Sequence, residues 1–295
     1  MLLRDFLRTV FGPAHLGIAP RSLANYDYAA RSYSSWLGRP ATLGDLATVP
    51  LRQWLAARAE VRAAATVNTE AKHLEALWRC AVAEGLVPGP AAKLPRMACE
   101  LQEPEAWTAE EFSRLVQVAA AQPGLVARVP AAAWWCSLLL VLYDTGERIS
   151  AVLQVRMADC ALDRGGLLVR RRKTHRARWY ALAEDTLRWL RLAAGERELA
   201  WPVPWTRNWL DERLRRLCCD AGLACGRRRG GLWHKIRRTS GSLVEAAGGD
   251  GSAHLGNSRA IFERHYRDPR LCGTSTVSLL PRPTIPDRPP LRVVS

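Results

Sequence analysis

The sequence predicts a mainly α-helical fold with a small β-hairpin, organised in two domains. Its 295 residues exceed what one hydrophobic core commonly organises, so a division into two domains is expected. Apolar side chains recur at three- and four-residue steps over most of the chain, as they do along one face of an α-helix. Residues 166–182 differ, because two short extended segments flank a polar turn, which is typical of a β-hairpin.

The first domain is predicted to span residues 1–88 and to be built from helices alone. Residues 22–36 and 66–84 each place apolar side chains on one helical face, and the second segment stops at Gly85, a residue that commonly ends helices. Residues 43–58 predict a shorter pair of helices between them. A compact domain of four or five helices follows from this pattern.

The second domain is predicted to span residues 107–270, after a linker at residues 89–106. The linker is rich in proline and has no hydrophobic period. Thr108 then opens a helix with Glu111 three residues later, which is a capping-box pattern. The Pro-rich tail at residues 271–295 is predicted to be extended or disordered.

Most of the second domain is expected to be helical. The apolar run at residues 131–143 is too short to cross a bilayer and predicts a core helix. The strands of the hairpin are expected at residues 166–172 and 178–182. Further helices are expected near residues 184–194, 206–221, 236–247 and 258–266.

The charge of the chain indicates a polyanionic partner. The sequence holds 43 Lys and Arg against 28 Asp and Glu, a formal net charge of +15, and nearly all of the excess is Arg. Guanidinium groups match phosphate oxygens with two parallel hydrogen bonds. A genome that favours Arg codons gives the same composition, so the positions of individual residues have to decide.

The eight cysteines do not predict a metal centre. They form no C-x-x-C pair and no zinc-ligand spacing, so free thiols in a reducing compartment are expected. The N-terminal residues lack the long apolar stretch of a secretory signal. We therefore expect a cytoplasmic protein with no membrane segment, no metal and no cofactor.

Four short motifs carry candidate chemistry, and each also has a plain structural explanation. Arg148 follows a helix that ends at Gly146, where guanidinium and helix N-terminal N–H groups can hold a phosphate; taken alone, the motif is better explained by a solvated surface Arg. Lys173 lies in the basic turn of the hairpin, where it can act as a general acid or can simply be solvated. His234 and Arg237 are three residues apart, a spacing that also occurs by chance.

The fourth motif is a tyrosine among basic residues. Tyr266 ends the segment SRAIFERHY, which Ser258 can cap as a helix. Basic neighbours stabilise a phenolate and make tyrosine a competent nucleophile. An amphipathic Tyr at a domain surface is the alternative explanation.

The order and spacing of these motifs resemble the tyrosine recombinases, the phage-integrase family. The resemblance rests on TGERIS, a Lys in a basic hairpin, His-x-x-Arg, and Leu-Gly-x-Ser with a Tyr nine residues after x, and it covers about residues 20–270. It implies an N-terminal helical, SAM-like core-binding domain and an α+β catalytic domain that form a C-shaped clamp on DNA.

The resemblance also implies a role for each residue of the motifs. Arg148 and Arg237 would clamp the phosphate, and Lys173 would protonate the leaving 5′ oxygen. His234 would accept the proton of Tyr266, the nucleophile. The remaining candidate site residue is Asn257, the x of Leu-Gly-x-Ser.

Three positions depart from the family pattern. Where the family usually has an acidic residue three positions after the first Arg, this chain has Ala151. Arg238 stands where a second His is common. Asn257 replaces the usual His or Trp; it can donate a hydrogen bond to a phosphoryl oxygen but carries no charge. His254, three residues upstream, is out of register with that position.

The function implied is site-specific DNA recombination or integration through a 3′-phosphotyrosyl intermediate, without metal or ATP. The implied partners are double-stranded DNA and, in the active state, a homo-tetramer on two duplexes that is monomeric when free, with no small-molecule substrate. Two alternatives stay open. One is a non-catalytic DNA-binding protein that keeps the fold, which Asn257 and Ala151 favour; the other is a topoisomerase IB-like strand-passage enzyme with the same chemistry.

Overall fold

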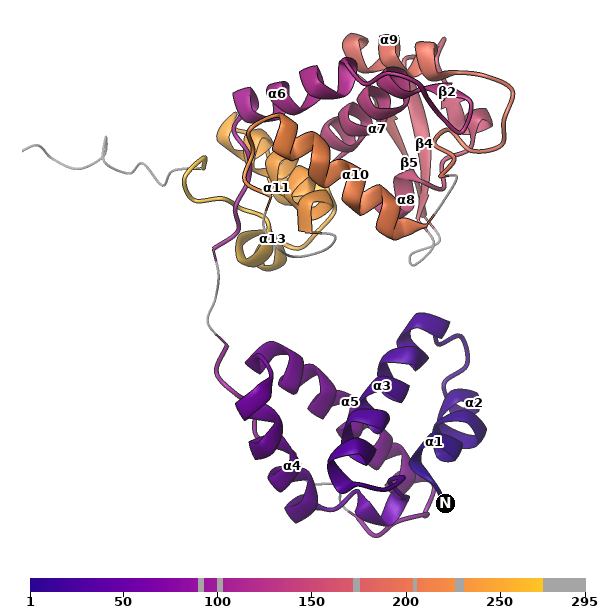
Figure 1. The fold of residues 1–295 in the computed structure, drawn as a ribbon, viewed down its shortest axis with the longest axis vertical. Helices are drawn as coiled ribbons and strands as arrows, with labels where there is room; N and C mark the ends of the chain where they lie inside the picture. Colours follow the sequence, from indigo (N-terminus) through magenta and orange to yellow (C-terminus); the bar gives the residue numbers. More distant parts are fainter. Residues whose placement is uncertain (90–92, 100–102, 172–175, 204–205, 226–230, 273–295) are drawn as a thin grey trace, which may run out of the picture. The chain divides into compact units, whose positions relative to one another are not determined.

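The computed structural model describes residues 1–89, 93–99, 103–171, 176–203, 206–225 and 231–272. The chain forms two compact units, Met1–Leu101 and Gln102–Ser295. Helices make up most of both, and the described strands form one two-stranded and one three-stranded sheet (Figure 1). The mainly α fold with a small β component is thus confirmed.

The first unit is an all-helical bundle around buried aromatic side chains. Tyr33 and Trp54 are fully buried and meet edge to face, with ring centroids 5.8 Å apart. The N-terminal residues also belong to this core, because Phe6 and Phe11 are almost completely buried. Its helices are α1 (Leu3–Phe6), continued by a π-helical turn (Leu7–Phe11) and α2 (Gly12–Ala14), then α3 (Pro20–Leu37), α4 (Thr48–Val61) and α5 (Ala64–Ala83).

Two expectations for this unit need correction. The segment at 43–58 is a single 3₁₀ turn, Leu43–Asp45, followed by α4, and not a pair of helices. The helical turns before residue 15 were not predicted, because each is too short to show a hydrophobic period.

A buried carboxylate joins three helices of the first unit. Glu70 on α5 is 3% exposed and accepts hydrogen bonds from Arg58 on α4 at 3.0 Å and from Ser32 on α3 at 2.9 Å. Because its charge is paired and hydrogen-bonded, burial of Glu70 is tolerated.

The second unit is arranged around one apolar helix, α7 (Ala131–Thr145). Trp134, Trp135 and nine further residues of this helix are buried. Helices α6, α9 and α11 pack against it, and Figure 1 shows α9 and α11 on different sides of it. The remaining helices are α6 (Ala109–Ala120), α8 (Ile149–Val152), α9 (Glu184–Ala193), α10 (Arg207–Asp220), α11 (Gly231–Ala246), α12 (Gly251–Leu255) and α13 (Arg259–His265).

The predicted capping box is present at the start of this unit. Thr108 accepts a hydrogen bond from the N–H of Glu111 at 3.1 Å, and the Glu111 carboxylate accepts one from the N–H of Thr108 at 3.0 Å. Two helices differ from expectation: α11 begins five residues earlier than residue 236, and the short α12 was not predicted.

The predicted hairpin is confirmed and is part of a three-stranded antiparallel sheet. Its strands are β4 (Gly166–Arg171) and β5 (Arg176–Ala181), with β3 (Cys160–Ala161) as an additional edge strand on β4. A separate two-stranded ladder, β1 (Leu125–Val126) and β2 (Val129–Pro130), precedes α7. Lys173 lies outside the described residues, between β4 and β5.

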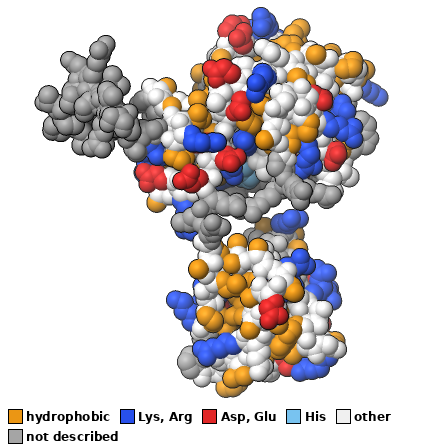
Figure 2. Space-filling view, turned by 60° about the vertical axis from the view of Figure 1, so that its left-hand side comes forward, with side chains coloured by type: hydrophobic (Ala, Val, Ile, Leu, Met, Phe, Trp, Pro, Cys, Tyr) orange, Lys and Arg blue, Asp and Glu red, His pale blue; other side chains and the backbone are white. Residues whose placement is uncertain are grey.

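The surface carries charge of both signs. Lys and Arg side chains are spread over both units on the face drawn in Figure 2, with Asp and Glu side chains among them. All eight cysteines lie in the described part of the chain and are free, as predicted. Among the described helices, none is long and apolar enough to cross a membrane.

Candidate active site

The site is built on the sharp turn after α7. Gly146 ends that helix with φ +58°, a backbone conformation that favours glycine. A Cβ at this position would also lie 2.5 Å from Leu255 and 3.0 Å from the His254 ring. Both facts require glycine. Because Gly146 has no side chain, α12 can pack directly against the end of α7. Arg148 is exposed and forms the N-cap position of α8 immediately after the turn.

Arg237 on α11 is the centre of the site. Its side chain is 1% exposed, and its guanidinium group donates hydrogen bonds to the carbonyl oxygens of Gly146 and Leu255, the latter at 2.7 Å. The same group lies 5.1 Å from the ring centroid of Tyr266 and 3.5 Å from Oδ1 of Asn257. One guanidinium group therefore joins the turn after α7, the end of α12 and the candidate nucleophile.

Electrostatics at Arg237 show how closely the charged groups are spaced. Burial lowers the pKa of Arg237, and the positive charge of Arg148 acts in the same direction, whereas Tyr266 opposes both. The two candidate phosphate-binding arginines are thus near enough to repel each other. An anion between them would relieve that repulsion.

Asn257 and Tyr266 are placed by the two short helices that follow. Helix α12 ends at Gly256 with φ +64°, and Ser258 caps α13 by accepting the N–H of Ile261 at 3.4 Å. Tyr266 follows the last residue of α13 and is 8% exposed, packed with Leu255. The neighbouring basic residues in the sequence did not show this burial: the ring is largely covered and lies against Arg237.

Two hydrogen-bond donors in this cluster have no partner among the described residues. Nε of Arg237 and Nδ2 of Asn257 are both buried and unpaired. Buried donors are nearly always satisfied in folded proteins. Two unpaired donors beside one tyrosine suit an acceptor ligand such as a phosphoryl oxygen.

His234 lies on the same helix as Arg237, and Lys173 lies outside the described residues. His234 is exposed on the first turn of α11, one helical turn before Arg237. The described part of the hairpin does reach the site, because Arg178 on β5 donates a hydrogen bond to the carbonyl oxygen of His254 at 3.1 Å. The structure thus brings Arg237, Asn257 and Tyr266 into contact and leaves Arg148 and His234 on exposed positions next to them.

His254 is linked through Ser240 to the last turn of α7. Its Nε2 lies 2.7 Å from Oγ of Ser240, which donates its own proton to the carbonyl oxygen of Tyr143 at 2.6 Å. The Ser240 hydroxyl is therefore the acceptor, and Nε2 carries the proton. Burial lowers the pKa of His254, and the charges of Arg178 and Arg237 act in the same direction. The neutral ring thus joins α12, to which His254 belongs, to Ser240 on α11.

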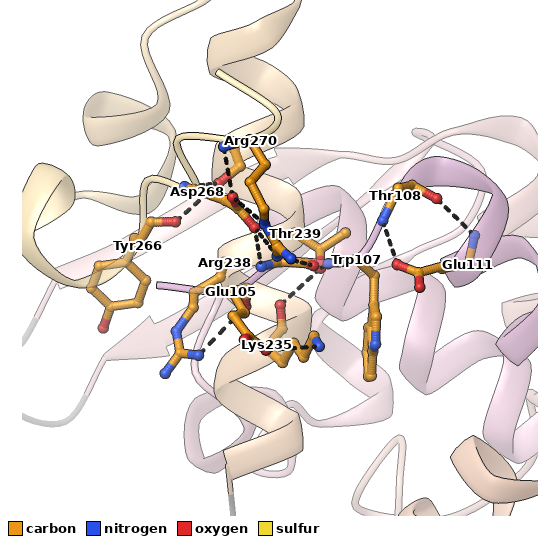
Figure 3. Close-up of polar contacts among 12 residues, drawn as sticks. Glu105, Trp107, Thr108, Glu111, Lys235, Arg238, Thr239, Tyr266, Asp268 and Arg270 are labelled. Carbon is orange, nitrogen blue, oxygen red and sulfur yellow. Dashed lines mark hydrogen bonds and ion pairs between the residues drawn. The ribbon is translucent and has the colours of Figure 1, made fainter. Parts of the chain in front are cut away.

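The chain after Tyr266 is fastened to the start of the second unit. Asp268 is fully buried and accepts the N–H of Ala106 at 2.7 Å and the guanidinium group of Arg270 at 2.6 Å (Figure 3). Burial alone would raise the pKa of Asp268, but these hydrogen bonds more than offset it, so the pKa is lowered. Ser242 on α11 donates to the carbonyl oxygen of Tyr266 and accepts the N–H of Asp268, both at 2.9 Å.

A second hydrogen bond fixes the same segment. The N–H of Trp107 donates to Oγ1 of Thr239 at 2.9 Å, and the ammonium group of Lys235 lies 5.4 Å from the Trp107 ring centroid (Figure 3). Residues on α11 thus bind two segments: Thr239 binds the start of the second unit at Trp107, and Ser242 binds the chain at Tyr266 and Asp268.

Asp268→Ala is expected to lower the free energy of unfolding of the second unit by about 2–3 kcal/mol, because the buried N–H of Ala106 loses its acceptor and Arg270 loses its partner. Urea unfolding followed by tryptophan fluorescence measures this change. Asp185→Ala, which removes an exposed carboxylate paired with Arg188, is the matched control and should leave stability nearly unchanged. Equal losses in the two variants would contradict the assigned role.

Comparison with known proteins extends these observations. No family model matches the chain. A probable integrase/recombinase from Methanocaldococcus jannaschii is 43% identical over 54 residues, which are 18% of this chain and 16% of that relative. The sequence match therefore spans only a small part of either protein.

Solved structures match over most of the chain. A lambda integrase dimer bound to a COC′ core site is 22% identical with a TM-score of 0.67, covering 98% of this chain and 100% of that one. The Tn1549 transposon integrase with transposon right end DNA is 10% identical with a TM-score of 0.68, covering 94% and 96%. XerH recombinase on a palindromic difH substrate is 17% identical with a TM-score of 0.65, covering 83% and 75%. The protein therefore has the fold of the tyrosine recombinases, from the helical first unit to the short helix that ends at the candidate nucleophile.

Proposed function

We propose that the protein is a site-specific DNA recombinase or integrase that cuts and rejoins strands through a 3′-phosphotyrosyl intermediate. The observation that carries the proposal is the contact of Arg237, with its unpaired Nε, to both Tyr266 and Asn257. The integrase and recombinase structures that share the fold were solved on DNA, which supports duplex DNA as the partner.

The chemistry follows from the groups in the site. The Tyr266 oxygen attacks the phosphorus of a phosphodiester, a tyrosyl–phosphate bond forms, and the bond to the 5′ oxygen breaks. The guanidinium groups of Arg148 and Arg237 stabilise the negative charge that develops on the non-bridging oxygens, and Nδ2 of Asn257 donates one hydrogen bond. A 5′-hydroxyl then attacks the phosphotyrosine and restores a phosphodiester, so the bond energy is conserved and no ATP is consumed.

Two residues are proposed to move protons. His234 accepts the proton of the tyrosine as it attacks, and Lys173 protonates the leaving 5′ oxygen. Both proposals rest on the family resemblance. The exposed position of His234 one turn before Arg237 is consistent with the first of them.

The same proposal assigns the domains. Residues 1–88 would be the core-binding domain, 89–106 the linker and 107–270 the catalytic domain, with the tail 271–295 mostly outside the described residues. The C-shaped clamp, the tetramer on two duplexes and the free monomer stay predictions. A protein that acts on chromosomal or plasmid DNA would be placed in the cytoplasm with the nucleoid.

The test is capture of the covalent intermediate. Duplex fragments tiling the DNA on both sides of the gene are first screened for binding; the bound fragment is then nicked at successive positions to make suicide substrates. An SDS-resistant protein–DNA adduct at one nick position is the expected result. Binding without any adduct would instead establish a DNA-binding protein that only keeps the fold. Relaxation of supercoiled plasmid without site preference would establish a topoisomerase.

A further inference from the structure

A buried carboxylate lies inside the turn that carries the first candidate arginine. Glu147 is 2% exposed. Its Oε1 accepts the hydroxyl of Tyr180 on β5 at 2.6 Å, and its Oε2 accepts the backbone N–H of Arg148 at 3.3 Å. Removing a carboxylate from water is costly unless opposite charges and hydrogen bonds compensate. Some positive charge nearby therefore has to compensate the burial of the Glu147 carboxylate.

The compensation comes from the concentration of positive charge around the turn. Arg237 binds the carbonyl oxygen of Gly146, the residue directly before Glu147. Arg148 is the residue directly after Glu147. Arg178 lies on β5 two residues before Tyr180, and its guanidinium group is 4.9 Å from the Tyr180 ring centroid. Burial lowers the pKa of both Arg237 and His254, and the charge of Glu147 opposes that lowering in part, so it acts on the interior of the site.

The position where tyrosine recombinases usually carry an acidic residue is occupied here by Ala151, on α8. Its methyl group packs against the apolar core and accepts no hydrogen bond. The carboxylate that does contact the backbone of Arg148 belongs to Glu147, which is four residues before Ala151. An acidic group is therefore present next to Arg148, but it precedes this arginine in the chain instead of following it.

We propose that Glu147 is a positioning residue of the active site, whose buried carboxylate sets the backbone of Arg148 and balances the charge of Arg237 in place of an acid at Ala151. Tyr180 holds that carboxylate in place from the sheet. The proposal rests on the proposed function, because positioning is measured through formation of the tyrosyl–DNA adduct.

The test compares rate with stability. Glu147→Gln keeps an acceptor oxygen for Tyr180 and removes the charge. At saturating suicide substrate it is expected to slow adduct formation by roughly 10- to 100-fold, less than the 10²–10³ typical for a donor that touches the transition state. Duplex affinity should change by less than about threefold. Adding Ala151→Glu to the same chain is expected to restore most of the rate.

The matched control is Glu70→Gln, which removes the charge of a buried carboxylate that is paired with Arg58 in the first unit. It should lower stability in urea and leave the adduct rate at saturating DNA unchanged. If Glu147→Gln does not fold by circular dichroism, Tyr180→Phe replaces it, with a several-fold slower rate expected.

The outcomes are separable. Loss of rate that Ala151→Glu restores supports the proposal. An unchanged rate in Glu147→Gln, or a loss that follows stability and is not restored, overturns it while the proposed function stands. Absence of any adduct with the unmodified chain overturns the proposed function, and this proposal with it.

Discussion

Tyr266→Phe is expected to form no covalent complex with DNA while binding the duplex almost as tightly as the unmodified protein. The substitution removes only the attacking oxygen. The ring still packs against Leu255 and Phe262, and Arg237 still lies over its face, so the local structure persists. An SDS gel of a suicide-substrate reaction measures the adduct, and a mobility shift under native conditions measures binding.

A second tyrosine of the same unit provides the control. The ring of Tyr143 on α7 stacks on Phe112 with centroids 4.5 Å apart, and its side chain is not part of the proposed machinery. Tyr143→Phe should therefore form the adduct at the ordinary rate. Covalent complex trapped with Tyr266→Phe would show that another residue is the nucleophile.

Arg237→Lys should reduce the rate of adduct formation by about 10²–10³ even though it keeps the charge. The guanidinium fork donates to two carbonyl oxygens and keeps a third, unpaired donor in Nε, whereas an ammonium group is a single point donor. Pre-steady-state adduct formation at saturating DNA separates this effect from a loss of affinity.

The same substitution at a surface position is its control. Arg191 on α9 is exposed and pairs with Glu184 at 2.7 Å, so Arg191→Lys should leave both rate and stability nearly unchanged. A rate for Arg237→Lys within threefold of the unmodified protein would mean that the fork does not contact the reacting phosphate.

Sequence reasoning worked best where a signal was local. The capping box at Thr108, the glycine stop at Gly146 and the strands beside residue 173 each depend on a few neighbouring residues, and each is present in the structure. The spacing from Asn257 to Tyr266 likewise spans one helix, which Ser258 caps.

The rest depended on contacts between distant segments. Nothing in TGERIS distinguishes a buried Glu147 from a solvated one, because its partner Tyr180 is 33 residues away. The tautomer of His254 follows from Ser240, which lies on another helix. Burial of the Tyr266 ring depends on Arg237, which lies on the same helix as Ser240, α11. Short turns such as α12 carry no hydrophobic period and are not detectable by one.

The hydrogen bond from Ala106 to Asp268 joins residues that are 162 positions apart. Contacts of such long separation form late, after the intervening chain has been made. A growing polypeptide still on the ribosome therefore lacks the acceptor of the Ala106 N–H until Asp268 has been made. The second unit can thus complete its fold only after translation has passed Asp268, although the segment that this residue fastens is among the first of the unit to be made.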